Sequence, residues 1–124
     1  MQPRPVALLL ALALFVAAGV AQVELKKDAV VFSGNASNTS APATMDEAKV
    51  RRATTEWQTI EADGIKRGSA RYMLLVAEMD KRIRSAAQKA ASGASKDLVV
   101  RAGDIANARG KTVADLTDDV IANL

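Results

Sequence analysis

The sequence predicts an α+β protein that consists of a helical hairpin, a small body of short β-strands and a C-terminal helix. Apolar residues alternate at spacings of four and three over residues 71–91, which is typical of a helix packed against a partner helix. The run Leu98, Val99, Val100 predicts a short buried strand. Asp118 and Asp119 lie where the N-terminus of a last helix favours acids. A chain of 124 residues accommodates one such domain.

Residues 1–21 have the pattern of a secretory signal. One base, Arg4, precedes an apolar run that ends in the small residues Gly19 and Ala21. The run is shorter than the roughly 20 residues that cross a bilayer as a helix. We therefore expect cleavage after Ala21 and export; the alternative is an uncleaved membrane anchor. A lipid anchor and disulfides both need cysteine, of which the chain has none.

Residues 22–42 are predicted to form a flexible linker. Residues 22–32 have the composition of a short strand, but residues 33–42 are small and mostly polar, with little to bury. Two N-glycosylation sequences begin at Asn35 and Asn38, and chance explains them more simply in a tract so rich in Asn and Ser. The folded domain is accordingly expected to span residues 43–124.

Two helices with a turn between them are predicted from residue 45 to residue 91. The first has Val50, Ala53, Trp57 and Ile60 at spacings of three and four, and Gly64 and Gly68 favour a turn after it. The apolar positions of the second helix form what we call the seam: Tyr72, Val76, Met79, Ile83, Ala86 and Ala90. Charged residues lie opposite, so this helix needs a cover, which we expect a neighbouring polypeptide to provide.

The remaining residues predict three short strands and a helix. The strands are expected at residues 97–101, 105–107 and 112–113, and the helix at residues 115–124, where Asp115 or Thr117 can accept its first amides. The predicted core and oligomer contacts are apolar side chains of the second helix, the first of these strands and the last helix: Val76, Met79, Ile83, Leu98, Val99, Val100, Leu116, Val120 and Ile121.

Composition excludes most catalytic sites. The chain has neither cysteine nor histidine, so thiol nucleophiles, histidine acid–base catalysis and the commonest metal ligands are absent. Carboxylate pairs such as Glu56 with Glu61 are not at a spacing that shares a helical face. Four aromatic residues are too few for a nucleic-acid stacking platform. We expect no enzymatic activity, no cofactor, no metal and no nucleic-acid partner.

The hairpin is the predicted binding surface. Residues 64–91 contain seven bases and two acids, so this arm can attract acidic unfolded chains, and the same surface also suits anionic lipid. The predicted client-binding residues are the apolar and basic side chains of the hairpin: Trp57, Ile60, Ile65, Lys66, Arg67, Arg71, Tyr72 and Leu75. The plainer interpretation is that the bases form a solvated helix face and that Trp57 and Tyr72 belong to the core.

The order of four motifs resembles a known family. They are Arg82-Ile83-Arg84-Ser85-Ala86, Asp97-Leu98-Val99-Val100, Ala102-Gly103-Asp104 and Asp115-Leu116-Thr117-Asp118-Asp119-Val120-Ile121. Over residues 80–124 the chain resembles the Skp/OmpH family of periplasmic chaperones for outer-membrane proteins, and residues 43–50 are similar to the strand and helix with which that family begins. The family's long tentacle helices are reduced here to residues 53–82.

The resemblance implies a function, a location and an assembly. It implies an ATP-independent holdase of the periplasm that binds unfolded outer-membrane or envelope proteins and forms a homotrimer around a shared β body. Each shortened arm would extend only about 20 Å, which puts a cavity able to enclose a whole client in doubt. The alternative is a non-catalytic structural or adaptor protein of the cell envelope that uses the same hairpin to bind one defined partner.

Overall fold

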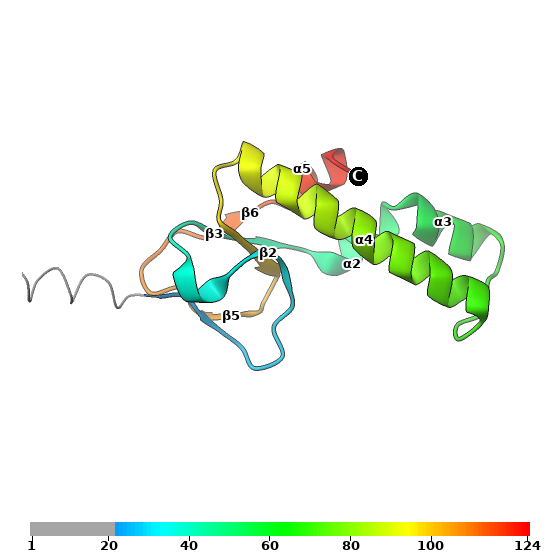
Figure 1. Cartoon of the computed structure of the whole chain (residues 1–124), viewed down its shortest axis with the longest axis horizontal. Coiled ribbons are helices and arrows are strands. Elements are labelled where there is room, and N and C mark those ends of the chain that lie inside the picture. The colour runs from blue at the N-terminus through cyan, green and yellow to red at the C-terminus, as the bar shows by residue number, and fades with distance from the viewer. Residues whose placement is uncertain (1–21) are drawn as a thin grey trace, which may run out of the picture.

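The computed structural model describes residues 22–124 and has an α+β fold, as predicted (Figure 1). The predicted signal peptide and the alternative membrane anchor both lie outside the described residues. A four-stranded sheet carries the long helix on one side, and a small two-stranded sheet lies on the other side. The predicted helical hairpin, strand body and C-terminal helix are all present.

The four-stranded sheet has the order β2-β4-β3-β6. Its strands are β2 (Val31–Gly34), β3 (Pro42–Met45), β4 (Leu98–Arg101) and β6 (Ala114–Asp115). β4 runs antiparallel to β2 and parallel to β3, and β3 is parallel to β6. Parallel neighbours need a long crossover. Here it is made of three helices: α2 (Glu47–Arg52), α3 (Thr55–Ala62) and α4 (Ala70–Gly93).

Polar side chains fix where the helices begin and end. The predicted first helix begins later than expected, because Met45 still belongs to β3. It is also divided into α2 and α3, with Thr54 as the residue that caps the start of α3. Asp46, Thr54 and Ser69 each accept a hydrogen bond from a backbone N–H in the first turn of the helix that follows. The last helix, α5 (Thr117–Ala122), is shorter than predicted, and Asp115 accepts from the Thr117 amide at 2.9 Å.

The prediction of a flexible linker at residues 22–42 is wrong. This segment supplies β1 (Glu24–Leu25), all of β2, the 3-10 helix η1 (Ala36–Asn38) and the start of β3, and Phe32 belongs to the core. β1 pairs with β5 (Ile105–Asn107) to form the second sheet. The polar tract is ordered because a distant carboxylate binds it: Asp97 accepts hydrogen bonds from the Thr39 hydroxyl, the Ser40 amide and hydroxyl, and the Ala41 amide.

Replacing Asp97 by alanine is expected to detach this tract. Burial raises the pKa of the Asp97 carboxyl, but the hydrogen bonds from Thr39, Ser40 and Ala41 outweigh burial and hold the pKa well below its ordinary value. Asp97→Ala should lower the free energy of unfolding at pH 7 by about 2 kcal/mol, a value discounted because the residue is partly exposed. Urea unfolding across pH measures this loss.

The pH dependence of that loss follows from the sign of the shift. A carboxylate with a lowered folded pKa stabilises the protein above its unfolded pKa, and this contribution disappears as the pH falls toward the folded pKa. The difference between Asp97→Ala and the unmodified chain should therefore be full at neutral pH and shrink below about pH 4. Asp28→Ala, an exposed carboxylate on the turn after β1, is the control. A difference that is unchanged down to pH 2 would contradict the assignment.

The chain itself covers the seam of α4. Met79, Ile83, Ala86 and Ala90 are all at most 4% exposed and pack in one cluster with side chains of the sheet and of α5. The expectation that a neighbouring polypeptide covers the seam is therefore wrong, because the seam packs against the sheet of the same chain. The other predicted core residues are also placed in this body: Leu98, Val99, Val100, Leu116 and Val120 are buried, and Val76 and Ile121 are half-buried against the core.

Candidate functional site

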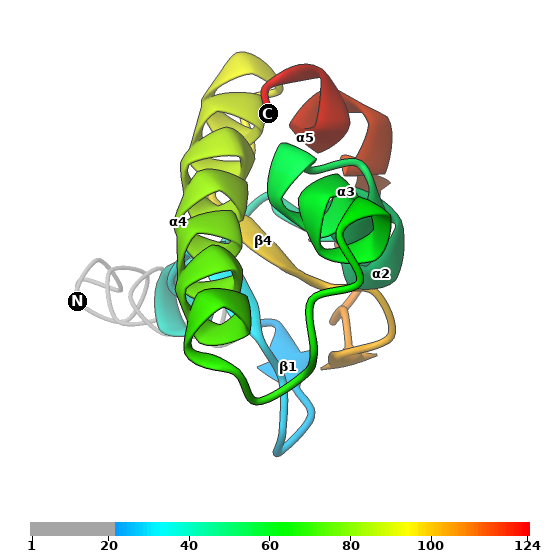
Figure 2. The same cartoon turned by 90° about the vertical axis from the view of Figure 1, so that its right-hand side faces the viewer.

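The distal half of the hairpin extends beyond the sheet as an arm (Figure 1). We define the arm as α3, the turn at residues 63–69 and the first two turns of α4, residues 70–77. Figure 2 views the molecule from this end and shows α3 and α4 side by side in front of the body. Gly64 and Gly68 take positive φ angles of 59° and 88°, as the predicted turn requires. Arg71 closes the turn by an ion pair of 3.0 Å with Asp63.

The predicted apolar binding residues of α3 and α4 are buried or half-buried. Tyr72 and Leu75 are half-buried on the side of α4 that also bears Met79, and Ile60 of α3 is only 6% exposed. Trp57 is half-buried against the core, and its indole N–H donates to Glu61 at 2.9 Å. Trp57 thus packs against the core, as the plainer interpretation predicted, and Ile60 presents almost no surface to a partner in this conformation.

The basic and turn residues of the prediction are more accessible. Lys66, Arg67 and Arg71 are exposed, and Ile65 is half-buried in the turn, where its amide donates to the Ile60 carbonyl at 3.0 Å. The structure therefore separates the predicted set into buried or half-buried apolar side chains and an exposed basic turn at the end of the arm.

The opposite side of α4 carries an apolar surface that the sequence analysis missed. Ala70, Met73, Leu74 and Ala77 follow one another at helical spacing on the face opposite the seam, and we call them the outward stripe. Met73 is 65% exposed and Leu74 is 61% exposed, the largest exposures among large apolar side chains in residues 22–124. Counting the apolar positions on this face would have found them. The sequence analysis instead treated the whole face opposite the seam as charged, although its charged residues lie later along α4.

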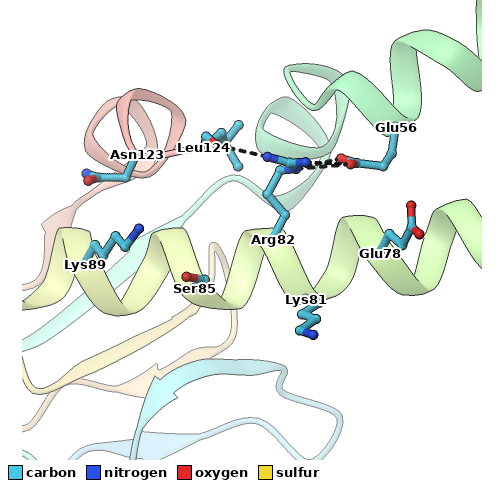
Figure 3. Close-up of a pocket in the computed structure, with 8 residues that line it drawn as sticks. All are labelled: Glu56, Glu78, Lys81, Arg82, Ser85, Lys89, Asn123 and Leu124. Carbon is cyan, nitrogen blue, oxygen red and sulfur yellow. Dashed lines mark hydrogen bonds and ion pairs between the residues drawn. The ribbon is translucent and has the colours of Figure 1, made fainter.

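Two ion pairs connect the helices at the base of the arm. The side chain of Glu56 in α3 is 8% exposed and accepts from the Arg82 guanidinium of α4 at 2.9 and 3.0 Å (Figure 3). Burial raises the pKa of Glu56, but its hydrogen bonds and charge interaction with Arg82 lower it by more. Arg51 of α2 pairs with Asp80 of α4 at 3.0 Å. The stripe is therefore carried on a helix whose orientation is fixed.

A pocket of about 390 Å³ lies beside this ion pair, between α3, α4 and the end of α5 (Figure 3). Arg82 reaches from α4 to Glu56 and also donates to the backbone oxygen of Leu124 at 3.2 Å, and Lys81 lines the pocket with its side chain directed away from Glu56. Both oxygens of Glu56 accept from Arg82. The Glu56 carboxylate is therefore committed to the ion pair with Arg82.

Residues 22–124 contain neither a cluster of metal ligands nor a helix that could cross a membrane. Nowhere in this part of the chain do three or more acidic side chains gather closely enough to hold a metal ion. None of its helices has both the length and the apolar character needed to cross a membrane. In comparisons with known proteins, no family model, no curated protein and no solved structure matches this chain.

Proposed function

We propose that this protein is an ATP-independent holdase that binds unfolded outer-membrane or envelope proteins after export to the periplasm. The observation that carries the proposal is the outward stripe: two large apolar side chains more than half exposed on a projecting helix. Soluble proteins seldom expose neighbouring large apolar side chains without a use for them, and such patches are typical of interaction sites. The resemblance to the Skp/OmpH family supports the same function.

The properties of the arm suit weak and reversible binding. Its surface is already exposed and its base is fixed by ion pairs, so capture of a client requires no nucleotide-driven opening. Full burial of one Met or Leu side chain contributes about 2 kcal/mol, and most of that is offset by the cost of ordering the bound segment. One arm therefore holds a short stretch loosely, and a long client gains from several arms at once.

The length of the arm limits what it can do with a client. The 24 residues of α4 span about 36 Å, and its second half is packed on the sheet. The free part is too short to surround a whole unfolded protein, so we propose contact with local segments. The homotrimer remains part of this proposal, because β2 and β6 are edge strands in which pairing with other copies would satisfy free backbone groups; light scattering tests it.

A test of the holdase compares the unmodified chain with Met73→Ser/Leu74→Ser. Several unrelated outer-membrane proteins are diluted from urea without ATP, and their aggregation is followed by turbidity. The unmodified chain should delay aggregation of most of them at near-stoichiometric ratio, and the double variant should lose most of that delay, because it removes the exposed apolar contact.

The matched control is Val113→Ser, which removes an exposed apolar side chain, 36% exposed, on the loop before β6. It should keep the full delay, and circular dichroism should show that all variants stay folded. No delay with any client would overturn the proposal. A strong effect on a single client would favour the adaptor protein instead.

A further inference from the structure

We propose that the outward stripe binds an extended polypeptide segment in which a short apolar stretch has an acidic residue at each end. This inference rests on the proposed function and specifies the kind of client segment that the arm selects. It follows from three features of the arm: the apolar stripe, the cations at its two ends and the distance between those cations.

The two ends of the stripe are marked by cations that have no acidic partner. Lys66 and Arg67 lie in the turn that precedes α4, and Lys81 follows Ala77 on the same face of the helix one turn later. None of these three forms an ion pair within the described part of the chain. Arg71, by contrast, is already paired with Asp63. Each end of the stripe thus offers a free positive charge to a ligand.

The charges disfavour a second copy of this chain as the occupant. If two copies packed stripe against stripe in antiparallel directions, Lys81 of each would face the basic turn of the other. In the parallel arrangement, Lys81 would face Lys81, and like charges at close range disfavour association. The stripe therefore needs a partner whose charges are opposite to its own.

A polypeptide fits this surface better than an anionic membrane does. Glu78 and Asp80 lie on either side of Lys81 around the helix, and both are exposed; Asp80 is paired with Arg51, and Glu78 forms no ion pair within residues 22–124. A flat anionic surface would approach the Glu78 carboxylate together with the lysine, at an electrostatic cost. A narrow chain that follows the helix axis meets the cations at the two ends and avoids the acids at the sides.

The spacing of the cations sets the length of the segment. Ala70 and Lys81 lie about 16 Å apart along α4, and the basic turn adds a few ångströms beyond Ala70. An extended chain advances about 3.3 Å per residue, so the two acids are expected to be about six residues apart. Successive side chains of an extended chain point to opposite faces. Two apolar residues at alternate positions between the acids would therefore lie on the same face as the acids and contact Met73 and Leu74.

The test uses fluorescein-labelled peptides of about seven residues and fluorescence anisotropy with the full chain. One peptide has an acid at each end and leucine at two alternate positions between them, all on one face. A second has the same composition with both acids at one end, and a third has lysine in place of both acids. The first should bind best, with roughly tenfold weaker binding of the second and none measurable for the third.

Chain variants locate the site. Met73→Ser/Leu74→Ser should weaken binding of the first peptide roughly tenfold, and Lys81→Glu roughly fivefold. The matched controls Val113→Ser and Lys27→Glu alter exposed side chains of the body and should change affinity less than about twofold. Equal binding of the first two peptides would overturn the inference, even if the chain delays aggregation. Binding of anionic vesicles that depends on Met73 and Leu74, without peptide binding, would also overturn it.

Discussion

Ile83→Asp is expected to unfold the protein at pH 7. Ile83 is 1% exposed and lies in the main core cluster together with Met79 and Val99. An aspartate there would bury a carboxylate without a partner, which costs several kcal/mol, in addition to the loss of the apolar contacts. Domains of this size are stable by only about 5–15 kcal/mol. Far-UV circular dichroism and urea unfolding should show lost helicity or a midpoint moved to much lower urea.

Two control variants separate the buried charge from other effects of the substitution. Gln88→Asp places the same residue on the exposed side of α4 and should cost about 0.5 kcal/mol. Ile83→Val keeps an apolar side chain and should cost about 1 kcal/mol. Since the chain itself covers the seam, the effect of Ile83→Asp should not depend on protein concentration. Full helicity and an unchanged midpoint for Ile83→Asp would contradict the packing of α4.

Local periodicity carries enough information to predict the elements that pack on one another through repeated apolar positions. The seam of α4, the turn with Gly64 and Gly68, and the strand β4 were all predicted from spacing and residue type, because each is determined by a short stretch of sequence. The strand predicted at residues 112–113 lies two residues later, as β6, because its hydrogen-bond partner is the distant strand β3.

Contacts between distant segments explain what the sequence did not reveal. The polar tract before β3 carries no apolar pattern, and its order depends on Asp97, which is more than fifty residues away. The strand β5 pairs with β1, and no local signal identifies that partner. The partner that covers the seam also depends on tertiary structure. An amphipathic helix predicts that something covers its apolar face, but the helix sequence does not tell whether the cover is another chain or a sheet of the same chain.

The candidate site also combines features set by local sequence with features set by contacts between distant segments. The basic turn was predicted from composition, whereas the burial of Ile60, a predicted binding residue, depends on the packing of α3 on α4. The outward stripe differs, because its spacing is local and was available in the sequence. Met73 and Leu74 directly follow the seam residue Tyr72 in one apolar run. Consecutive residues of a helix point in different directions, so Met73 and Leu74 face away from the seam although they belong to the same run.

Gly34→Ala is expected to destabilise the protein by about 3 kcal/mol or more, since it combines two costs. Gly34 at the end of β2 has φ = +85°, a conformation that L side chains rarely adopt. A Cβ at this position would also lie 1.9 Å from the Asp97 carbonyl oxygen, so β2 and β4 would have to separate. Urea unfolding of the purified variant measures the loss, which should include weaker protection of the β2 amides from hydrogen exchange.

Gly68→Ala distinguishes the two costs. Gly68 in the turn of the arm has nearly the same φ, +88°, but a Cβ there would meet nothing within 4 Å. This variant should therefore lose only the cost of the backbone conformation, about 1 kcal/mol. The difference between the two variants gives the cost of the close approach between β2 and β4. Equal losses would mean that β2 does not lie against Asp97, and the ordered N-terminal segment would then need another explanation, because the Asp97 carboxylate holds the tract that follows Gly34.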